Sequence, residues 1–127
     1  MKDDRGSLSA LLVCLVLAAM TLVGLVFDGG AGINEYMRLS DIAENAARVG
    51  AQEIDGIRAG EVHIDERSAE VASRNYLRMQ GVTGTVHATR DSVVVEVFGS
   101  TKFQILGLVG LSGRRIHVLR SARLVAG

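Results

Sequence analysis

The stretch that decides the fold is RGSLSALLVCLVLAAMTLVGLVFDGG, residues 5–30. No charged side chain occurs in residues 8–27. At about 1.5 Å per residue, a helix of roughly 20 residues matches the ~30 Å hydrocarbon thickness of a bilayer. The sequence therefore predicts a transmembrane helix over residues 8–27, preceded by a short cytoplasmic tail or leader over residues 1–7.

The charges around this run predict its orientation. Lys2 and Arg5 precede it, and the next basic residue is Arg38. Basic residues favour the cytoplasmic side, so we expect the N-terminus inside and the remainder outside. A cleaved secretory signal is the alternative, and cleavage would leave a chain that starts near Gly32. Signal cores are usually about 7–15 residues long, shorter than this run, so we expect the segment to be retained.

The composition of the chain disfavours nucleic-acid binding but excludes few other functions. The 127 residues include 14 basic and 14 acidic side chains, and Trp is absent. Without a basic surplus or aromatic platforms, nucleic acid is not an expected partner. The single cysteine, Cys14, precludes an intramolecular disulfide and is expected to be a small hydrophobic side chain.

A glycine cluster follows the apolar run. Asp28, Gly29, Gly30 and Gly32 are interpreted as a joint at the membrane boundary, spanning residues 28–32. A helical pattern then resumes to about residue 57. If the glycines only flex the helix, residues 8–57 form one rod of ~75 Å. The expected inward face consists of Ile33, Tyr36, Met37, Ser40, Ala43, Ala47, Gly50, Ile54 and Ile57.

Small side chains form a narrow face in the centre of this second helical stretch. Its members are Ala43, Ala46, Ala47, Gly50 and Ala51. Such a face permits close approach of another backbone, either a partner helix in a membrane or the sheet of the same chain. We favour packing against the chain's own sheet.

The remaining pattern predicts a small head over residues 33–127. Asp65 is a candidate N-cap for a second helix that ends near Met79, before Gly81. Alternating segments at 81–89, 93–98 and 116–125 predict about three antiparallel strands, the first two forming a hairpin. The expected fold class is α+β, with a long N-terminal transmembrane and stalk helix followed by a small head.

Residues able to perform chemistry are scattered. His63, His87 and His117 have no ligand partners at a metal-binding spacing. The glycines at 107, 110 and 113 lack the pattern of a phosphate loop, and no serine has a neighbouring base. We therefore expect no catalytic residue, no metal and no cofactor, and predict that the protein is not an enzyme.

Three segments carry a resemblance to a known family: Asp28-Gly29-Gly30, DIAENAARVGA at residues 41–51, and FQILGLVGL at residues 103–111. Together with the apolar helix, they make the chain similar to the TadE/TadG-like proteins of bacterial Tad (tight adherence, Flp) pilus assembly. The resemblance implies a pseudopilin or minor pilin in the cytoplasmic membrane and, in some members, in a surface fibre. Its implied partners are other pilins and the proteins of the assembly platform.

The resemblance also implies a processing site. Prepilin peptidase cuts some members after a glycine, which corresponds here to Gly6 and would leave Ser7 as the first residue. Type IV-like pilins carry Glu at the fifth mature position, where this chain has Leu11. The difference favours the TadG-like branch and a subunit that acts at initiation or at the tip. The alternative is a single-pass anchored or secreted binding domain unrelated to pili.

Overall fold

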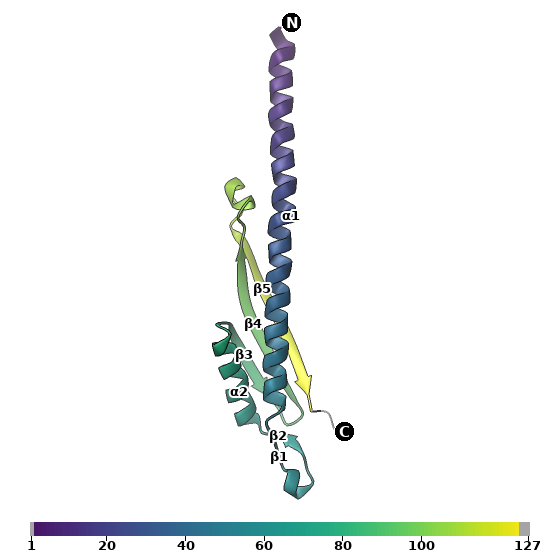
Figure 1. Cartoon of the computed structure of the whole chain (residues 1–127), viewed down its shortest axis with the longest axis vertical. Helices are drawn as coiled ribbons and strands as arrows, with labels where there is room; N and C mark the ends of the chain where they lie inside the picture. The colour runs from purple at the N-terminus through teal and green to yellow at the C-terminus, as the bar shows by residue number, and fades with distance from the viewer. Residues whose placement is uncertain (1, 125–127) are drawn as a thin grey trace. The chain divides into compact units, whose positions relative to one another are not determined.

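The computed structural model describes residues 2–124 and confirms the predicted α+β fold class. The chain divides into two compact units. Figure 1 labels the α-helices and the strands along the chain. The first contains the chain up to Ile33 together with Thr101–Arg114, and the second contains Asn34–Ser100 together with the chain from Arg115 onward. The long helix passes from the first unit to the second directly after the glycine cluster.

Helix α1 (Lys2–Ala51) runs without a break through residues 28–32. The glycines therefore do not interrupt the helix in this structure. Flexing of the helix at residues 28–32 stays a prediction. The helix ends at Ala51, so the predicted extension to about residue 57 is wrong. Strand β1 begins at Ile54, and Gly56 has a φ of 80°, which no right-handed helix accommodates.

The inward face of α1 differs from the predicted one. Ile33 and Met37 are 62% and 58% exposed, and Tyr36 is also exposed, so their assignment to this face is wrong. Met37 precedes Ala43 by six residues, which places it about 120° away at ~100° per residue. Ile54 and Ile57 follow the end of the helix. The buried stripe is Leu39, Ile42, Ala43, Ala46, Ala47 and Gly50.

Helix α2 (Glu66–Met79) has the bounds that its capping signals predict. The Asp65 carboxylate accepts hydrogen bonds from the Ser68 hydroxyl at 2.7 Å and the Ser68 N–H at 3.4 Å. Gly81, with a φ of 67°, follows the helix end. Ala69, Ser73 and Leu77 form its buried face, spaced four residues apart as a helix requires.

The three predicted strands form one sheet in the order β3 (Thr83–Ala88), β4 (Ser92–Lys102), β5 (Gly113–Arg123). Strands β3 and β4 are antiparallel, with Val86 opposite Val95. Strand β4 continues beyond the predicted end at residue 98. A further two-stranded sheet, β1 (Ile54–Asp55) with β2 (His63–Ile64), encloses the short helix η1 (Ile57–Ala59) and was not predicted. Two-residue strands are too short for an alternating pattern.

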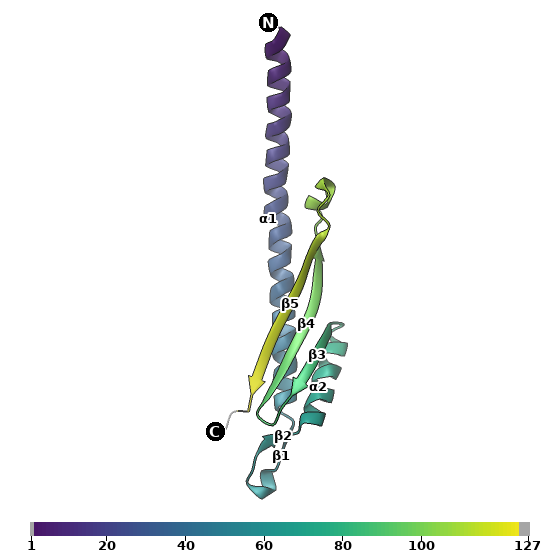
Figure 2. The same cartoon turned by 180° about the vertical axis from the view of Figure 1, so that it is seen from behind.

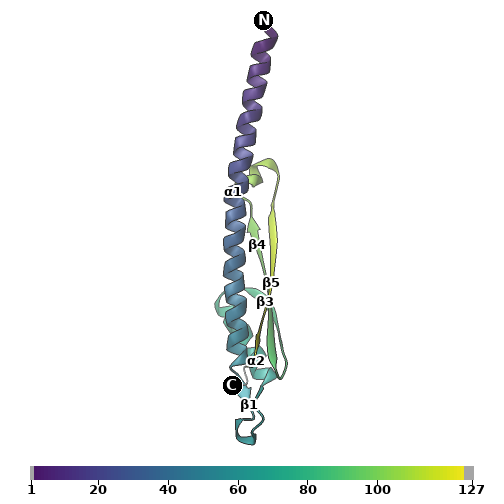
Figure 3. The same cartoon turned by 90° about the vertical axis from the view of Figure 1, so that its right-hand side faces the viewer.

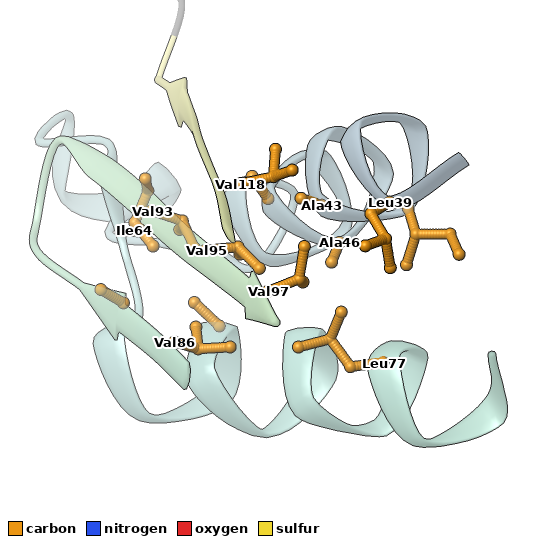
Figure 4. Packing of buried hydrophobic residues seen from close by; sticks show 14 of the residues in the cluster. Leu39, Ala43, Ala46, Ile64, Leu77, Val86, Val93, Val95, Val97 and Val118 are labelled. Atoms are coloured by element: carbon orange, nitrogen blue, oxygen red, sulfur yellow. The ribbon is translucent and has the colours of Figure 1, made fainter. Parts of the chain in front are cut away.

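The core of the second unit lies between the sheet and its two helices. Alternate residues of β4, namely Val93, Val95 and Val97, are fully buried. They meet side chains from α1, α2, β3 and β5 (Figure 4). Figure 2 shows the sheet from its opposite face, which neither helix covers. The unit is therefore a two-layer arrangement with both helices on one face of the sheet.

Candidate functional site

A buried carboxylate joins α1 to the loop between β4 and β5 within the first unit. Asp28 Oδ1 accepts a hydrogen bond from the N–H of Gln104 at 3.0 Å. Its Oδ2 accepts from the N–H of Ile105 at 3.1 Å and from that of Leu106 at 2.7 Å. One side chain thus binds three successive backbone donors some 76 to 78 positions further along the chain.

Burial makes these hydrogen bonds necessary. Asp28 is 1% exposed, although it follows a run of apolar residues whose side chains are mostly exposed. A buried ionised carboxylate without partners costs several kcal/mol, and hydrogen bonds to a charged acceptor are roughly twice as strong as neutral ones. The three N–H donors therefore allow Asp28 to lie between the helix and the loop, and they fix the loop's position along the helix.

One helical turn before Asp28, a glycine gives the loop room. A Cβ added to Gly24 would lie 2.9 Å from Cγ2 of Ile105 and 3.1 Å from Cδ2 of Leu106. A side chain at position 24 would therefore require the side chains of Ile105 and Leu106 to shift. Gly24 and Asp28 lie four residues apart on one helix face, so they form a single contact surface for the loop. Figure 3 shows this loop beside α1.

On the N-terminal side of this contact, the loop and α1 enclose an apolar groove. Its lining comes from Leu17, Met20 and Thr21 of α1 and from Ile105, Leu106 and Leu108 of the loop. Leu106 is buried, whereas Leu108 is 80% exposed and Leu111 is 52% exposed. The loop therefore presents apolar side chains outward beside the helix segment that carries no charge.

Within the loop, a short helix orders the backbone. Helix η2 (Leu106–Val109) begins where the Asp28 carboxylate accepts its hydrogen bonds, and it ends at Gly110, whose φ is 94°. The N–H of Leu111 donates to the carbonyl of Leu106, and that of Leu108 to the carbonyl of Ile105. The glycines at 110 and 113 both have positive φ, which suits residues without a Cβ.

The residues predicted for processing lie at the exposed start of α1. Gly6 and Ser7 are exposed and helical, and Leu11 is 66% exposed. A Cβ added to Gly6 would meet no atom within 4 Å. The same open space surrounds Gly29, Gly30 and Gly32, so these three glycines are not required for a close contact in this chain.

The predicted small-residue face packs inside the second unit. Ala43 and Ala47 are fully buried members of the core, and Ala51 is packed against it. A Cβ added to Gly50 would collide with the hydroxyl of Ser73, which donates a hydrogen bond to the carbonyl of Ala46 at 2.9 Å. In this structure, α1 therefore lies close to α2 at Gly50, and an added Cβ there would also lie 3.1 Å from Cγ1 of Val93 in the sheet.

The histidines are not brought together. His63 contacts the carbonyl of Glu61, and His117 contacts the Glu96 carboxylate and stacks on Phe98 with ring centroids 5.3 Å apart. His87 is exposed on β3. Across the described residues 2–124, no cluster of three His, Cys, Asp or Glu side chains could hold a metal ion.

The contact between Asp28 and the loop is the feature of the candidate site that sequence reasoning missed. The sequence pattern places Asp28 at the membrane boundary and shows residues 103–111 only as an apolar segment. Two signals were available: an isolated carboxylate at the end of an apolar run, and an apolar, glycine-containing segment too short to span a membrane. Nothing local in the sequence indicates that the two meet.

Helix α1 contains a segment long and apolar enough to cross a membrane, and only 6% of that segment is buried within the protein. No curated protein and no solved structure matches the chain. One family model does match, over α1 and the two residues that follow it, leaving the segment 103–111 outside the match. Residues 6–53 match the model of the putative Flp pilus-assembly TadE/G-like family, so the helical part of the chain has the similarity that its sequence predicted.

Proposed function

We propose that this chain is a non-enzymatic, membrane-anchored minor pilin or pseudopilin that acts in the assembly, initiation or capping of a Tad-type, type IV-like pilus. The observation that carries the proposal is the match to the TadE/G-like family over residues 6–53, which contains the exposed apolar segment of α1. The small α+β head that follows suits a subunit whose role is to contact other proteins.

Anchoring is supported by the exposure of the apolar helix. Leu8, Leu11, Leu15 and Leu22 are each more than 60% exposed. Exposed leucine side chains in water forgo roughly 1.5–3 kcal/mol each relative to burial. The segment therefore needs either lipid or neighbouring helices around it. A bilayer supplies the first environment and a fibre core supplies the second, so one helix serves a subunit that moves from membrane to fibre.

Orientation follows from the flanking charges. Lys2 and Arg5 precede the apolar segment, whereas Arg38 is the first basic residue after it. The positive-inside rule then gives a cytoplasmic N-terminus and a head outside the cytoplasmic membrane. In this orientation, the exposed Gly6–Ser7 bond faces the cytoplasmic edge, where prepilin peptidase would cut it.

The expected partners are other pilins and the platform proteins that extract them from the membrane. The apolar side chain of Leu11 cannot neutralise a neighbouring subunit's N-terminal amine as a carboxylate would. A subunit of this kind is better suited to a fibre end, where fewer neighbours surround it, than to the repeating shaft. This supports initiation or capping over a role as major subunit.

The test is intact mass and N-terminal sequence of the protein recovered separately from membranes and from sheared surface fibres, with fibre counts in a deletion strain. A chain that begins at Ser7 and occurs in fibres identifies a minor pilin. A chain confined to membranes, with fibres lost on deletion, identifies a pseudopilin of the assembly machinery. A product that begins near Gly32, or fibres unchanged by deletion, contradicts the proposal and leaves the alternative, a binding domain unrelated to pili.

A matched pair of variants tests the processing site. Gly6→Leu should block cleavage, while Gly29→Leu should leave it intact. Both glycines lie on α1, and at both positions an added Cβ meets no atom within 4 Å, so neither change disturbs packing. Cleavage that persists in Gly6→Leu would exclude this bond as the processing site.

A further inference from the structure

We propose that the β4–β5 loop, residues 103–111, inserts into the head-side leaflet of the bilayer that α1 crosses. The protein would then enter the membrane at two places, through α1 and through this segment, called here the apolar tip. The inference rests on the membrane anchoring in the proposed function. It adds a lipid-binding surface on a part of the chain that lies outside the family match.

The first argument is the depth at which the apolar tip would lie in the membrane. The apolar tip lines a groove with Leu17, Met20 and Thr21 of α1, all of which lie in the charge-free run. Thr21 precedes Asp28 by seven residues and Leu17 precedes it by eleven, or about 10 and 16 Å along a helix. Half the hydrocarbon thickness is ~15 Å. If Asp28 lies at the boundary, the tip extends from the boundary to about the middle of the bilayer.

Charge is the second argument. No charged residue occurs in 103–111, whereas Lys102 precedes the tip and Arg114 and Arg115 follow it. All three basic residues are exposed. Basic side chains at the edges of an apolar segment are placed to contact anionic headgroups while the segment itself enters the acyl region. This pattern favours lipid as the occupant over a second copy of the chain.

Satisfied backbone donors are the third argument, because unpaired N–H groups are costly in lipid. Asp28 accepts the hydrogen bonds from Gln104, Ile105 and Leu106. The N–H groups of Leu108 and Leu111 donate within the tip, as does that of Gly110. The Asp28 carboxylate thus pairs the backbone N–H donors at the start of the loop, as an apolar environment requires.

Exposed apolar area is the fourth argument. Leu108 is 80% exposed and lines the groove together with exposed side chains of α1, and Leu111 is 52% exposed. Among residues 2–124, no side chain covers either leucine fully. Their outward position next to a lipid-facing helix is what a membrane-inserted tip requires.

The test places an environment-sensitive fluorophore on single cysteines of the full chain in vesicles of phosphatidylcholine and phosphatidylglycerol. The chain's one native cysteine, Cys14, is exposed in the charge-free run and reports on α1 itself. In a Cys14→Ser background, Leu108→Cys reports on the tip. Met79→Cys, on α2 and 82% exposed, is the matched apolar control in the head.

Lipid carrying a nitroxide on its acyl chain should quench the probes at positions 14 and 108 and leave the probe at 79 unquenched. Quenching at 14 without quenching at 108 overturns the inference while the membrane anchor stands. Absence of quenching at 14 contradicts the anchor itself. Equal quenching at 79 and 108 also overturns the inference, because the head would then adsorb without preference for the tip.

A second measurement excludes a protein partner as the cause of burial. Diluting labelled Leu108→Cys protein with unlabelled chain and with additional lipid should leave the emission of the tip probe unchanged. Emission that shifts toward the aqueous value on dilution with lipid would show that the tip is buried against another copy, which overturns the proposal.

Discussion

The carboxylate of Asp28 accepts a hydrogen bond from the N–H of Leu106 at 2.7 Å, and so joins α1 to η2 across 78 residues of sequence. Asp28 is the single carboxylate placed between the charge-free run and the glycine cluster. Its two oxygens also bind Gln104 and Ile105. A side chain that would otherwise mark only the edge of a membrane segment thereby holds a loop against the helix.

Asp28→Asn should release this loop. The amide retains one acceptor oxygen and replaces the other with an N–H₂ group that faces backbone donors. A buried donor that loses its partner costs about 1–3 kcal/mol, so the amides of Gln104, Ile105 and Leu106 should exchange with solvent roughly 5- to 150-fold faster. Hydrogen exchange of the full chain in detergent micelles, followed by mass spectrometry, measures this change.

Asp41→Asn is the matched control for that experiment. Asp41 is also an aspartate of α1, but it is exposed and belongs to the second unit. Its replacement should leave the exchange of residues 104–106 unchanged. Identical exchange in Asp28→Asn and the wild type would show that the carboxylate does not hold the loop.

Gly24→Leu should displace the same loop by a steric route. The leucine side chain would occupy the position of Ile105 and Leu106, whose atoms lie 2.9 and 3.1 Å from an added Cβ. Overpacking of this kind typically costs about 1–3 kcal/mol, so the loop amides should again exchange faster. Gly29→Leu adds the same side chain where no atom lies within 4 Å, and should have no effect. Equal exchange in the two variants would contradict the contact at Gly24.

Local signals explain which parts of the fold were predictable. The bounds of α2 followed from Asp65 and Gly81, and the hairpin followed from alternation around Arg90 and Asp91. The inward face of α1 was predicted wrongly because apolar residues lie on more than one side of that helix, and only the sheet decides which side is buried. The stripe through Leu39 packs on the sheet, whereas Met37 does not.

The candidate site could not be predicted, for a related reason. Neither Asp28 nor Leu106 has a neighbouring sequence pattern that predicts a contact with the other. Their contact depends on how strands β4 and β5 extend toward the loop. The length of β4 was underestimated because Gly99, a residue type that is depleted in strands, follows Phe98. A strand that ends at residue 98 gives no indication of where residues 103–111 lie.

Stability of the head should depend on pH through Asp65. Hydrogen bonds from the Ser68 hydroxyl, and then from the Ser68 N–H, hold the pKa of Asp65 below its ordinary value of 3.8. A lowered folded-state pKa stabilises the head above the unfolded pKa, and this contribution is lost as the pH falls through the folded value. Thermal melts from neutral to strongly acidic pH should therefore show wild type losing stability relative to Asp65→Asn, which caps the helix without titrating.

Ser68→Ala removes the largest cause of that pKa shift and should reduce the pH dependence relative to wild type. Other carboxylates titrate in every variant. The change in stability caused by Asp65→Asn is therefore measured once with Ser68 present and once in the Ser68→Ala background, and the two changes are compared. If the stability difference between the wild type and the Asp65→Asn variant stays constant across this pH range, the assignment to Asp65 is wrong.

Gly50→Ala should destabilise the head, although alanine favours helices by up to ~1 kcal/mol over glycine. The added Cβ would collide with the Ser73 hydroxyl and lie 3.1 Å from both the Ala69 carbonyl oxygen and Cγ1 of Val93. Overpacking costs about 1–3 kcal/mol, which exceeds the gain in propensity. Urea denaturation followed by the fluorescence of Tyr76, which packs against the core, measures the loss. Gly30→Ala is the control, since no atom lies within 4 Å of its added Cβ.

The Gly50→Ala, Ser73→Ala double variant identifies the cause of that loss. Ser73→Ala alone removes the hydrogen bond to the Ala46 carbonyl, at a cost of about 0.5–1.5 kcal/mol. It also removes the hydroxyl that the new Cβ would meet, so the double variant should lose less stability than the two single variants combined. Additive losses would show that the two positions do not contact each other, and that the close approach of α1 and α2 at this point does not limit the size of residue 50.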